Sequence, residues 1–375
     1  MKKIIFFLLL ISNISFSQAD SISRLQVSVI TCAPGNELYS IFGHTAIRIV
    51  DTANQQDIIF NYGTFDFEDP NFLMKFTRGK LDYFLSAEDA TFFFAAYQAE
   101  GRTITEQVLQ LSDVEKRNIK QALFKNISGN NKFYKYDFLF DNCTTRIKDL
   151  LKNNSSFTCS KQLVKNGTTF RNMLYVYLDS TGMCWSKLGI DLLLGSKIDK
   201  AVSIEQTSFL PDYLMFAIDS LNAKQQFISD RKTYKAPIPN FSSYNYLPLL
   251  VFSLLFLMVA ISSFSKNKIA AKVFHYLSLT LLFTTGLVGC LLMFMWLGTD
   301  QKNCANNYNL LWALPTNIIA VFFANRQTRL KKIYFKTALI ISILLVVTWF
   351  ILPQQFNIAF LPLALAMAFC YKKFL

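Results

Sequence analysis

The chain has 375 residues, 52% of them hydrophobic, and a formal net charge of +13. Most of this excess lies beyond residue 265, where 11 Lys and Arg residues accompany a single acid, Asp300, and fall between apolar segments. The part between the leader and this region is nearly neutral. The charge therefore excludes nucleic-acid binding and indicates basic loops beside a membrane.

The first 19 residues (1–19) predict a signal peptide. Lys2 and Lys3 precede an apolar run over residues 4–11, and Ser17-Gln18-Ala19 provides a small-residue cleavage site. A run this short does not comfortably span a hydrocarbon core of about 30 Å, which favours cleavage over an uncleaved anchor. The residues that follow are therefore expected outside the cytoplasm.

A strand-rich domain is predicted over residues 20–240. The apolar run 25–32 indicates a strand, and the alternation after His44 predicts a second strand that begins at this histidine. Residues 58–62 form the next predicted strand, which ends in Asn61-Tyr62-Gly63. If the second and third strands form a hairpin, Asn61 approaches His44 on one face of the sheet.

The rest of this domain mixes helical and irregular stretches. Residues 67–86 are aromatic-rich and irregular, and residues 189–199 and 209–214 are interpreted as ordered connections toward the membrane part. Ser112 and Glu115 make a capping box for a helix. The other predicted elements are a helix over 88–99, a strand over 102–111, and helices over 113–127 and 142–152.

Cys143 is the candidate nucleophile. It follows Asp141 and Asn142, which suit a helix N-cap, and a thiol at a helix N-terminus is stabilised as thiolate. An isolated cysteine is more often a small buried residue. His44 is the only histidine outside the membrane part. It favours a catalytic role for Cys143 over simple burial, because a nearby imidazole activates a thiol. Asn61 would orient the imidazole, and the Cys143 backbone N–H would bind an oxyanion.

Other polar residues are candidates for substrate binding, and several have a structural alternative. Arg48 and Arg146 suit a phosphate or carboxylate, and internal ion pairs with Asp51 or Asp149 explain them equally well. Asp141 is a polar contact or only a helix cap. The predicted substrate-binding residues are Tyr39, Arg48, Tyr62, Asp141, Asn142 and Arg146.

Neither a metal nor a cofactor is expected. Zinc is the rival explanation for a Cys and His pair, but it takes three or four ligands, and the outer domain has one histidine and no CxxC motif. Cys159 and Cys184 could form a disulfide in an oxidising compartment, or remain two buried thiols.

Residues 245–375 predict a helical membrane domain. Five apolar segments alternate with loops, and the basic loops fall on one side throughout. This pattern places the outer domain on the periplasmic side of the inner (cytoplasmic) membrane and the C-terminus in the cytoplasm. The first two segments are long enough to span, whereas the others are shorter. The predicted spans are about 246–264, 274–298, 309–324, 337–352 and 356–371.

Together these features resemble the Bacteroidota lipoprotein N-acyltransferase family, Lnb, over nearly the whole chain. The resemblance implies an α+β periplasmic domain of circularly permuted papain-like (NlpC/P60-like) fold, followed by an all-α membrane domain of about five helices. It also implies Cys143 as nucleophile and His44 as base, and the permutation accounts for His preceding Cys. The signatures are TCAPGNELYSIFGHTAIRIVD (31–51), FNYGTFDFEDPNF (60–72), YDFLFDNCTTRIKD (136–149), GIDLLLGSKID (189–199) and NYNLLW (307–312).

The activity that the resemblance implies is acyl transfer. A fatty acyl chain would move from a membrane phospholipid, through a Cys143 thioester, to the α-amino group of a diacylglyceryl-cysteine lipoprotein. The expected partners are therefore the phospholipid donor, the diacylated lipoprotein acceptor and the membrane itself. A thioester-to-amide exchange is downhill, which suits a compartment without ATP.

Three other functions remain open. An NlpC/P60-type cell-wall amidase or peptidase would use the same dyad but needs no five spans. A cysteine phospholipase differs only in passing the acyl group to water. A non-enzymatic membrane assembly factor would have no need for both His44 and Cys143.

Overall fold

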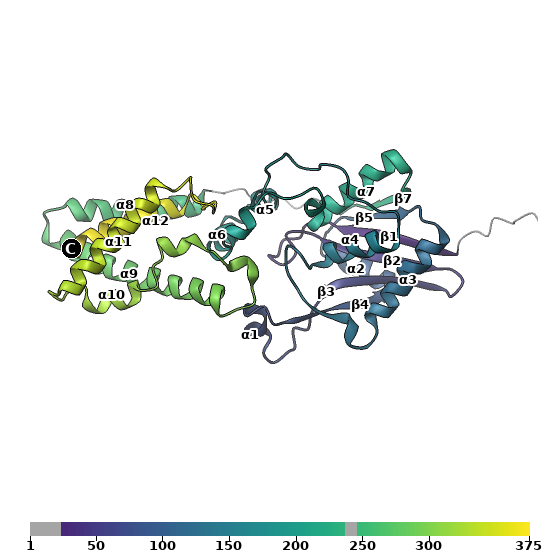
Figure 1. Ribbon diagram of the computed structural model, residues 1–375, viewed down its shortest axis with the longest axis horizontal. Helices are drawn as coiled ribbons and strands as arrows, with labels where there is room; N and C mark the ends of the chain where they lie inside the picture. The colour runs from purple at the N-terminus through teal and green to yellow at the C-terminus, as the bar shows by residue number, and fades with distance from the viewer. Residues whose placement is uncertain (1–23, 237–245) are drawn as a thin grey trace, which may run out of the picture.

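The computed structural model describes residues 24–236 and 246–375. It has two parts arranged end to end, an α+β domain and a bundle of helices (Figure 1). The predicted α+β domain followed by a helical part is confirmed. The predicted signal peptide, residues 1–19, lies outside the described residues.

The α+β domain is built on one antiparallel sheet of seven strands in the order β6-β4-β3-β2-β1-β5-β7. The strands are β1 (Leu25–Cys32), β2 (His44–Asp51), β3 (Gln56–Thr64), β4 (Asp82–Asp89), β5 (Ile104–Leu109), β6 (Phe133–Lys135) and β7 (Ile228–Tyr234). The predicted hairpin of β2 and β3 is confirmed, with Ile47 opposite Phe60 and Asp51 opposite Gln56.

Helices cover both faces of this sheet. Helix α2 (Ala90–Ala99) packs on one face, and α3 (Asp113–Ile127), α4 (Cys143–Asn154) and α7 (Pro211–Gln225) pack on the other. The domain also contains α1 (Phe72–Thr77), α5 (Phe170–Ser180) and α6 (Cys184–Leu193). Ile47 and Ile49 of β2 share a core with α3, α4 and α7. Ala46 points to the other face, where it shares a core with Phe93 of α2. The strand alternation therefore sends His44 and Ala46 toward α2 and their neighbours toward α4.

Local signals fit the helix starts well. The capping box of Ser112 and Glu115 forms as predicted at the start of α3. Two regions differ from expectation. Residues 67–86 contain α1 and most of β4. Residues 189–199 contain the end of α6 and a 3₁₀ turn over Ser196–Asp199, and residues 209–214 contain the start of α7. β4 is half-exposed at its aromatic positions and pairs with β3 and β6, contacts that local periodicity does not reveal.

The helical part contains α8 (Leu247–Phe264), α9 (Lys268–Leu297), α10 (Asn317–Phe323), α11 (Arg329–Val347) and α12 (Phe360–Lys373). Within the described residues, α8 and α9 are the two helices long and apolar enough to cross a membrane. Their mean hydropathies are 2.4 and 2.1. They coincide with the first two predicted spans, 246–264 and 274–298.

The third predicted span, 309–324, is not one continuous helix. It holds a 3₁₀ turn over Tyr308–Leu311, an irregular stretch, and the seven-residue α10. The irregular stretch packs directly on α9, where a side chain at Gly289 would collide with the backbone of residues 313–315. Asn317 is fully buried and bonds to Thr285 and Tyr371. Trp312, Ala313 and Asn317 in and beside this stretch are therefore buried within the helical part.

The two parts of the molecule are joined by a buried polar junction. The signatures at 189–199 and 307–312 meet there: Asn309 Nδ2 donates to the Asp191 carbonyl at 2.8 Å, and Asn307 Nδ2 to that of Leu192 at 2.7 Å. The Asp191 carboxylate accepts from Arg171 at 2.7 Å and from Asn357 at 2.8 Å. Arg171 and Asp191 are both fully buried.

Candidate functional site

Cys143 is the first residue of α4, at the end of the sheet where β2 begins. Asn142 caps this helix: its side-chain oxygen accepts from the backbone N–H groups of Thr144 and Thr145, each at 2.8 Å. The cap does not use the N–H of Cys143 itself. The thiol and the backbone N–H of Cys143 thus lie together at the positive end of the helix dipole.

The cysteine is 8% exposed and belongs to the core between the sheet and α4. Burial raises the pKa of the thiol, but the charge and hydrogen bond of His44 outweigh it, aided by the Thr45 backbone N–H and the Thr144 hydroxyl. The net result is a thiol pKa of about 7, below the ordinary 9.0. The sulfur therefore carries more thiolate at neutral pH than an unperturbed cysteine, which is only a few per cent thiolate.

His44 occupies the complementary position. Burial lowers the pKa of its imidazole, but the charge and hydrogen bond of Cys143, with a further bond from Asn61, raise the pKa above 6.5. The two residues thus stabilise a thiolate and imidazolium pair. They arrive from opposite faces of the sheet and meet at its end, because His44 faces α2 whereas α4 covers the other face.

Asn61 lies beside His44, as predicted from the β2–β3 hairpin. Its Oδ1 is 3.1 Å from His44 Nε2, and its Nδ2 donates to Glu88 Oε1 at 2.7 Å. A carboxylate only accepts, so Glu88 sets the orientation of the amide, and Asn61 Oδ1 must then accept from an Nε2–H. That tautomer leaves Nδ1 of the ring for the thiol.

Two further residues complete the surroundings of His44. Glu88 on β4 holds Asn61, and Tyr97 on α2 stacks on the imidazole with ring centroids 6.2 Å apart and planes 15° apart. Sequence reasoning missed both. Residues 88–99 were predicted as one helix, so nothing indicated that Glu88 lies on a strand beside β3, where its carboxylate accepts from the Asn61 side chain.

The two arginines predicted as substrate ligands are engaged within the domain. Arg48 bonds to Asp57 and Glu106, on the α2 face of the sheet. Arg146 bonds to Asp141 at 2.6 Å and lies over the ring of Tyr134. The internal-ion-pair alternative describes both, with partners other than the Asp51 and Asp149 that were expected.

The remaining predicted substrate-binding residues have varied surroundings. Tyr62 is 5% exposed, and its hydroxyl donates to Asn126 at 2.8 Å, so it is part of the core. Asn142, rather than Asp141, is the helix cap, and its Nδ2 donates to two backbone carbonyls. Tyr39 is 74% exposed on the loop before β2.

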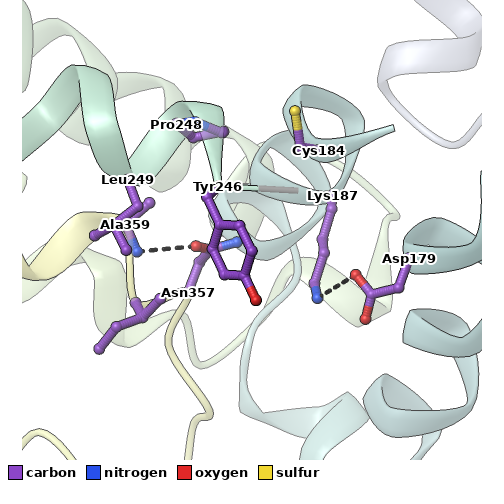
Figure 2. Close-up of a pocket in the computed structure, with 9 residues that line it drawn as sticks. Asp179, Cys184, Lys187, Tyr246, Pro248, Leu249, Asn357 and Ala359 are labelled. Atoms are coloured by element: carbon purple, nitrogen blue, oxygen red, sulfur yellow. Dashed lines mark hydrogen bonds and ion pairs between the residues drawn. The ribbon is translucent and has the colours of Figure 1, made fainter. Parts of the chain in front are cut away.

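Cys159 and Cys184 are free thiols in the structure, so the second of the two alternatives, two unpaired thiols, describes them. Cys159 Sγ is 3.6 Å from the Ser208 hydroxyl, whereas Cys184 begins α6. Cys184 lines a cavity of about 310 Å³ at the junction, together with Lys187 and Tyr246 (Figure 2). Lys187 is paired there with Asp179 at 2.7 Å. The two thiols belong to different packing units, which sequence spacing does not reveal.

No candidate metal centre accompanies this site. Within residues 24–236 and 246–375, no group of three or more His, Cys, Asp and Glu side chains is placed to hold a metal ion. The arrangement is a buried thiol, an imidazole and an amide in a hydrogen-bonded series, which can form and resolve an acyl thioester without a cofactor.

The fold and site define a class: a membrane protein whose α+β domain carries a thiol–imidazole pair above a helical part. Family models described as the Lnb N-terminal periplasmic domain and the Lnb transmembrane domain match residues 15–174 and 240–372. The chain belongs to the Lnb family, as its motifs indicated, and is a membrane protein with a periplasmic domain. Family membership suggests a lipoprotein N-acyltransferase-type enzyme. No curated protein and no solved structure matches the chain.

Proposed function

We propose that this protein transfers a fatty acyl chain from a phospholipid to the α-amino group of diacylated lipoproteins, with Cys143 as nucleophile. The observation that carries the proposal is the hydrogen-bonded series of Cys143, His44 and Asn61 in a chain of this family. A His-bearing strand, an adjacent strand with the orienting amide, and a helix that begins with the cysteine also support a circularly permuted papain-like domain.

In the first half-reaction the Cys143 thiolate attacks an ester carbonyl of the phospholipid. The carbonyl oxygen becomes an oxyanion, for which the backbone N–H of Cys143 is the candidate donor. The C–O ester bond then breaks, and the imidazolium of His44 gives its proton to the departing alkoxide. The products are a lysophospholipid and an acyl thioester on Cys143, with His44 neutral.

In the second half-reaction the free α-amine of the lipoprotein attacks the thioester carbonyl. Neutral His44 accepts a proton from the amine, the C–S bond breaks, and an amide forms while the thiolate returns. Asn61 holds the ring by accepting from Nε2–H, so Nδ1 faces the reacting atoms throughout. The aromatic residues around Cys143 limit access of water to the thioester, which favours transfer over hydrolysis.

Five crossings of the inner membrane, with the C-terminus in the cytoplasm, are part of the proposal. The basic residues near 266–272, 326–336 and 372–373 then lie together on the cytoplasmic side. The helical part confines the enzyme, its donor and its acceptor to one plane. This raises the effective concentration of both lipids at the site.

The test uses the purified full-length protein in nanodiscs that contain phospholipid and a synthetic diacylated lipopeptide. Mass spectrometry should find the lipopeptide with one added acyl amide and an equal amount of lysophospholipid. Without lipopeptide, a hydroxylamine-sensitive acyl group should remain on Cys143. Cys143→Ala should abolish all three signals, whereas Cys159→Ala, at a thiol outside the site, should keep them.

Other outcomes would replace the proposal. Free fatty acid and lysophospholipid without acylated lipopeptide would show a phospholipase. Cleavage of a peptidoglycan fragment, with no action on lipids, would show a cell-wall amidase or peptidase. Lipoprotein maturation that persists in cells carrying Cys143→Ala would show that the chemistry belongs to another protein.

A further inference from the structure

The short helix α1 leaves a large apolar surface uncovered. None of its residues is buried, and four apolar side chains of the segment 65–76 are 47% to 74% exposed: Phe67, Leu73, Met74 and Phe76. Soluble surfaces rarely gather so many large apolar groups in one short segment. Such a cluster, with Lys75 beside it, is typical of a segment that rests in a membrane interface.

The position of α1 also fits a segment that rests in a membrane interface. The N–H of Asp300 donates to the Arg78 carbonyl at 2.9 Å, and Gln301 Nε2 to that of Phe76 at 3.0 Å. Both donors directly follow α9, the 30-residue apolar helix that ends at Leu297. The segment is thus tied to the place where α9 emerges, at the end of the α+β domain that faces the helical part (Figure 1).

Basic side chains lie beside the same loop, which contains Asp300 and Gln301. A cavity of about 360 Å³ is lined by Lys197, Lys302 and Trp296 together with the loop that follows α9. Neither ammonium group forms an ion pair within residues 24–236 and 246–375. Two free cations and a tryptophan at the end of an apolar helix suit the phosphate and glycerol region of a phospholipid.

A row of aromatic rings leads from α1 toward the nucleophile. Phe72 of α1 stacks on Phe65 at 5.7 Å, Phe65 lies 5.2 Å from Tyr83, and Tyr83 stacks on Tyr136 at 4.6 Å between ring centroids. Tyr136 and Cys143 border the same point beside Gly63, each 3.7 Å from a Cβ placed there. The rings therefore form an unbroken packed series from the exposed segment to the residues beside the thiol.

We propose that α1 inserts into the periplasmic leaflet of the inner membrane and that the phospholipid acyl donor reaches Cys143 along this aromatic row. The exposed side chains of residues 65–76 would contact the acyl chains, and Lys197 and Lys302 the phosphate. The inference rests on the proposed function for the fate of the lipid. The membrane contact itself does not depend on it.

The first test is photo-crosslinking of the full-length protein in nanodiscs with a phospholipid that carries a diazirine on one acyl chain. Mass spectrometry should locate label within residues 65–76 in the wild type and equally in Cys143→Ala, because docking precedes chemistry. Absence of label from this segment, with label on α8 and α9 as the internal control, would overturn the proposal.

The second test is the double variant Leu73→Gln/Met74→Gln. Both side chains are exposed, so the fold should be unaffected, but kcat/KM for phospholipid should fall about tenfold because two apolar groups no longer enter the bilayer. The KM for the lipopeptide acceptor should not change. Val114→Gln, at a 58% exposed site on α3, is the matched control and should transfer at the wild-type rate.

The docking proposal and the proposed function can be rejected independently of each other. Label in residues 65–76 without any acyl transfer would keep the docking proposal and reject the proposed function. Normal transfer by the double variant would reject the docking proposal and keep the function. A rise in the KM of the lipopeptide alone would assign α1 to the acceptor, and this too would overturn the proposal.

Discussion

At the residue scale, the site depends on how Cys143 and His44 share a proton. Neither would be reactive alone, since burial raises the pKa of the thiol and lowers that of the imidazole. Their mutual charge and hydrogen bond reverse both effects. The pair thus stays in its charged form in spite of burial, because a charge–charge attraction is stronger where water is excluded.

This coupling predicts a pH dependence. Alkylation of Cys143 by iodoacetamide, and kcat/KM for acyl transfer, should rise through a midpoint near pH 7, the pKa of the thiol. The sign follows from the lowered thiol pKa: the thiolate is present above the midpoint and is lost as the pH falls through it. His44→Ala should move the alkylation midpoint up toward or beyond the ordinary 9.0. An unchanged midpoint in that variant would show that another group lowers the pKa.

A second prediction concerns Asn61. Asn61→Ala removes the acceptor for His44 Nε2–H, so the ring can turn or take the other tautomer, and kcat should fall about tenfold to a hundredfold. Glu88→Gln keeps an acceptor for Asn61 Nδ2 and should have a smaller effect. The measurement is kcat, KM and the pH profile. Asn54→Ala, in the β2–β3 turn, is the control, and an equal loss there would indicate a general effect on the hairpin.

At the element scale, the junction between α6, the loop after α9 and the start of α12 joins the two parts of the molecule. Arg171 lies fully buried between Asp191 and Asp199, with bonds of 2.7 Å to each. Loss of one partner from a buried ion pair costs about 3–5 kcal/mol, because the other charge remains without compensation. Two of the family signatures, 189–199 and 307–312, therefore have a structural role, because they bond the α+β domain to the helical part.

Gly195 offers a clean test of this junction. Its φ of −82° suits any residue, but a Cβ there would collide with the Ala305 carbonyl across the junction. Gly195→Ala should therefore lower the free energy of unfolding by about 1–3 kcal/mol, as overpacking does. Thermal unfolding in detergent measures it, and acyl transfer should fall with it. Gly189→Ala, in α6 with open space around its Cβ, should not destabilise, and equal losses in both would contradict the assignment.

At the scale of the whole molecule, residues 305–324 decide the topology. The chain returns along α9 by a 3₁₀ turn, an irregular stretch and α10, so that Phe335 near the start of α11 packs on Phe374 at the end of α12. We infer that the segment crosses the bilayer although α10 is too short to do so as a helix. The fully buried Asn317 then lies inside the bundle, bonded to three other polar side chains.

This arrangement predicts the sides of the loops. Alkaline phosphatase, active only outside the cytoplasm, should be active when fused after residue 302 or 355. A cytoplasmic fluorescent reporter should fluoresce when fused after residue 327 or 375, because these ends carry the basic residues. Phosphatase activity after residue 327 would show that residues 305–324 form a re-entrant segment, and the predicted sides of α11 and α12 would then be exchanged.

Much of the architecture was predictable because its signals are local. Alternating residues marked β2, Ser112 and Glu115 marked the start of α3, and the hairpin of β2 with the strand that follows it brought Asn61 to His44. Cys143 was predicted at a helix N-terminus because Asp141 and Asn142, which suit an N-cap, precede it. Each of these depends on residues close in the chain, where side-chain spacing sets backbone conformation directly.

The sequence by itself therefore determined the family, the α+β domain, the apolar helices and the three residues of the candidate site. Only the tertiary structure decided that Glu88 orients Asn61 and that Asn309 meets Asp191, contacts that span 27 and 118 residues. It also decided that Arg48 bonds to acidic residues of its own domain, that Cys159 and Cys184 stay apart, and that α1 lies beside the end of α9. Such contacts depend on which surfaces pack together, and the local periodicity of a sequence does not predict this packing.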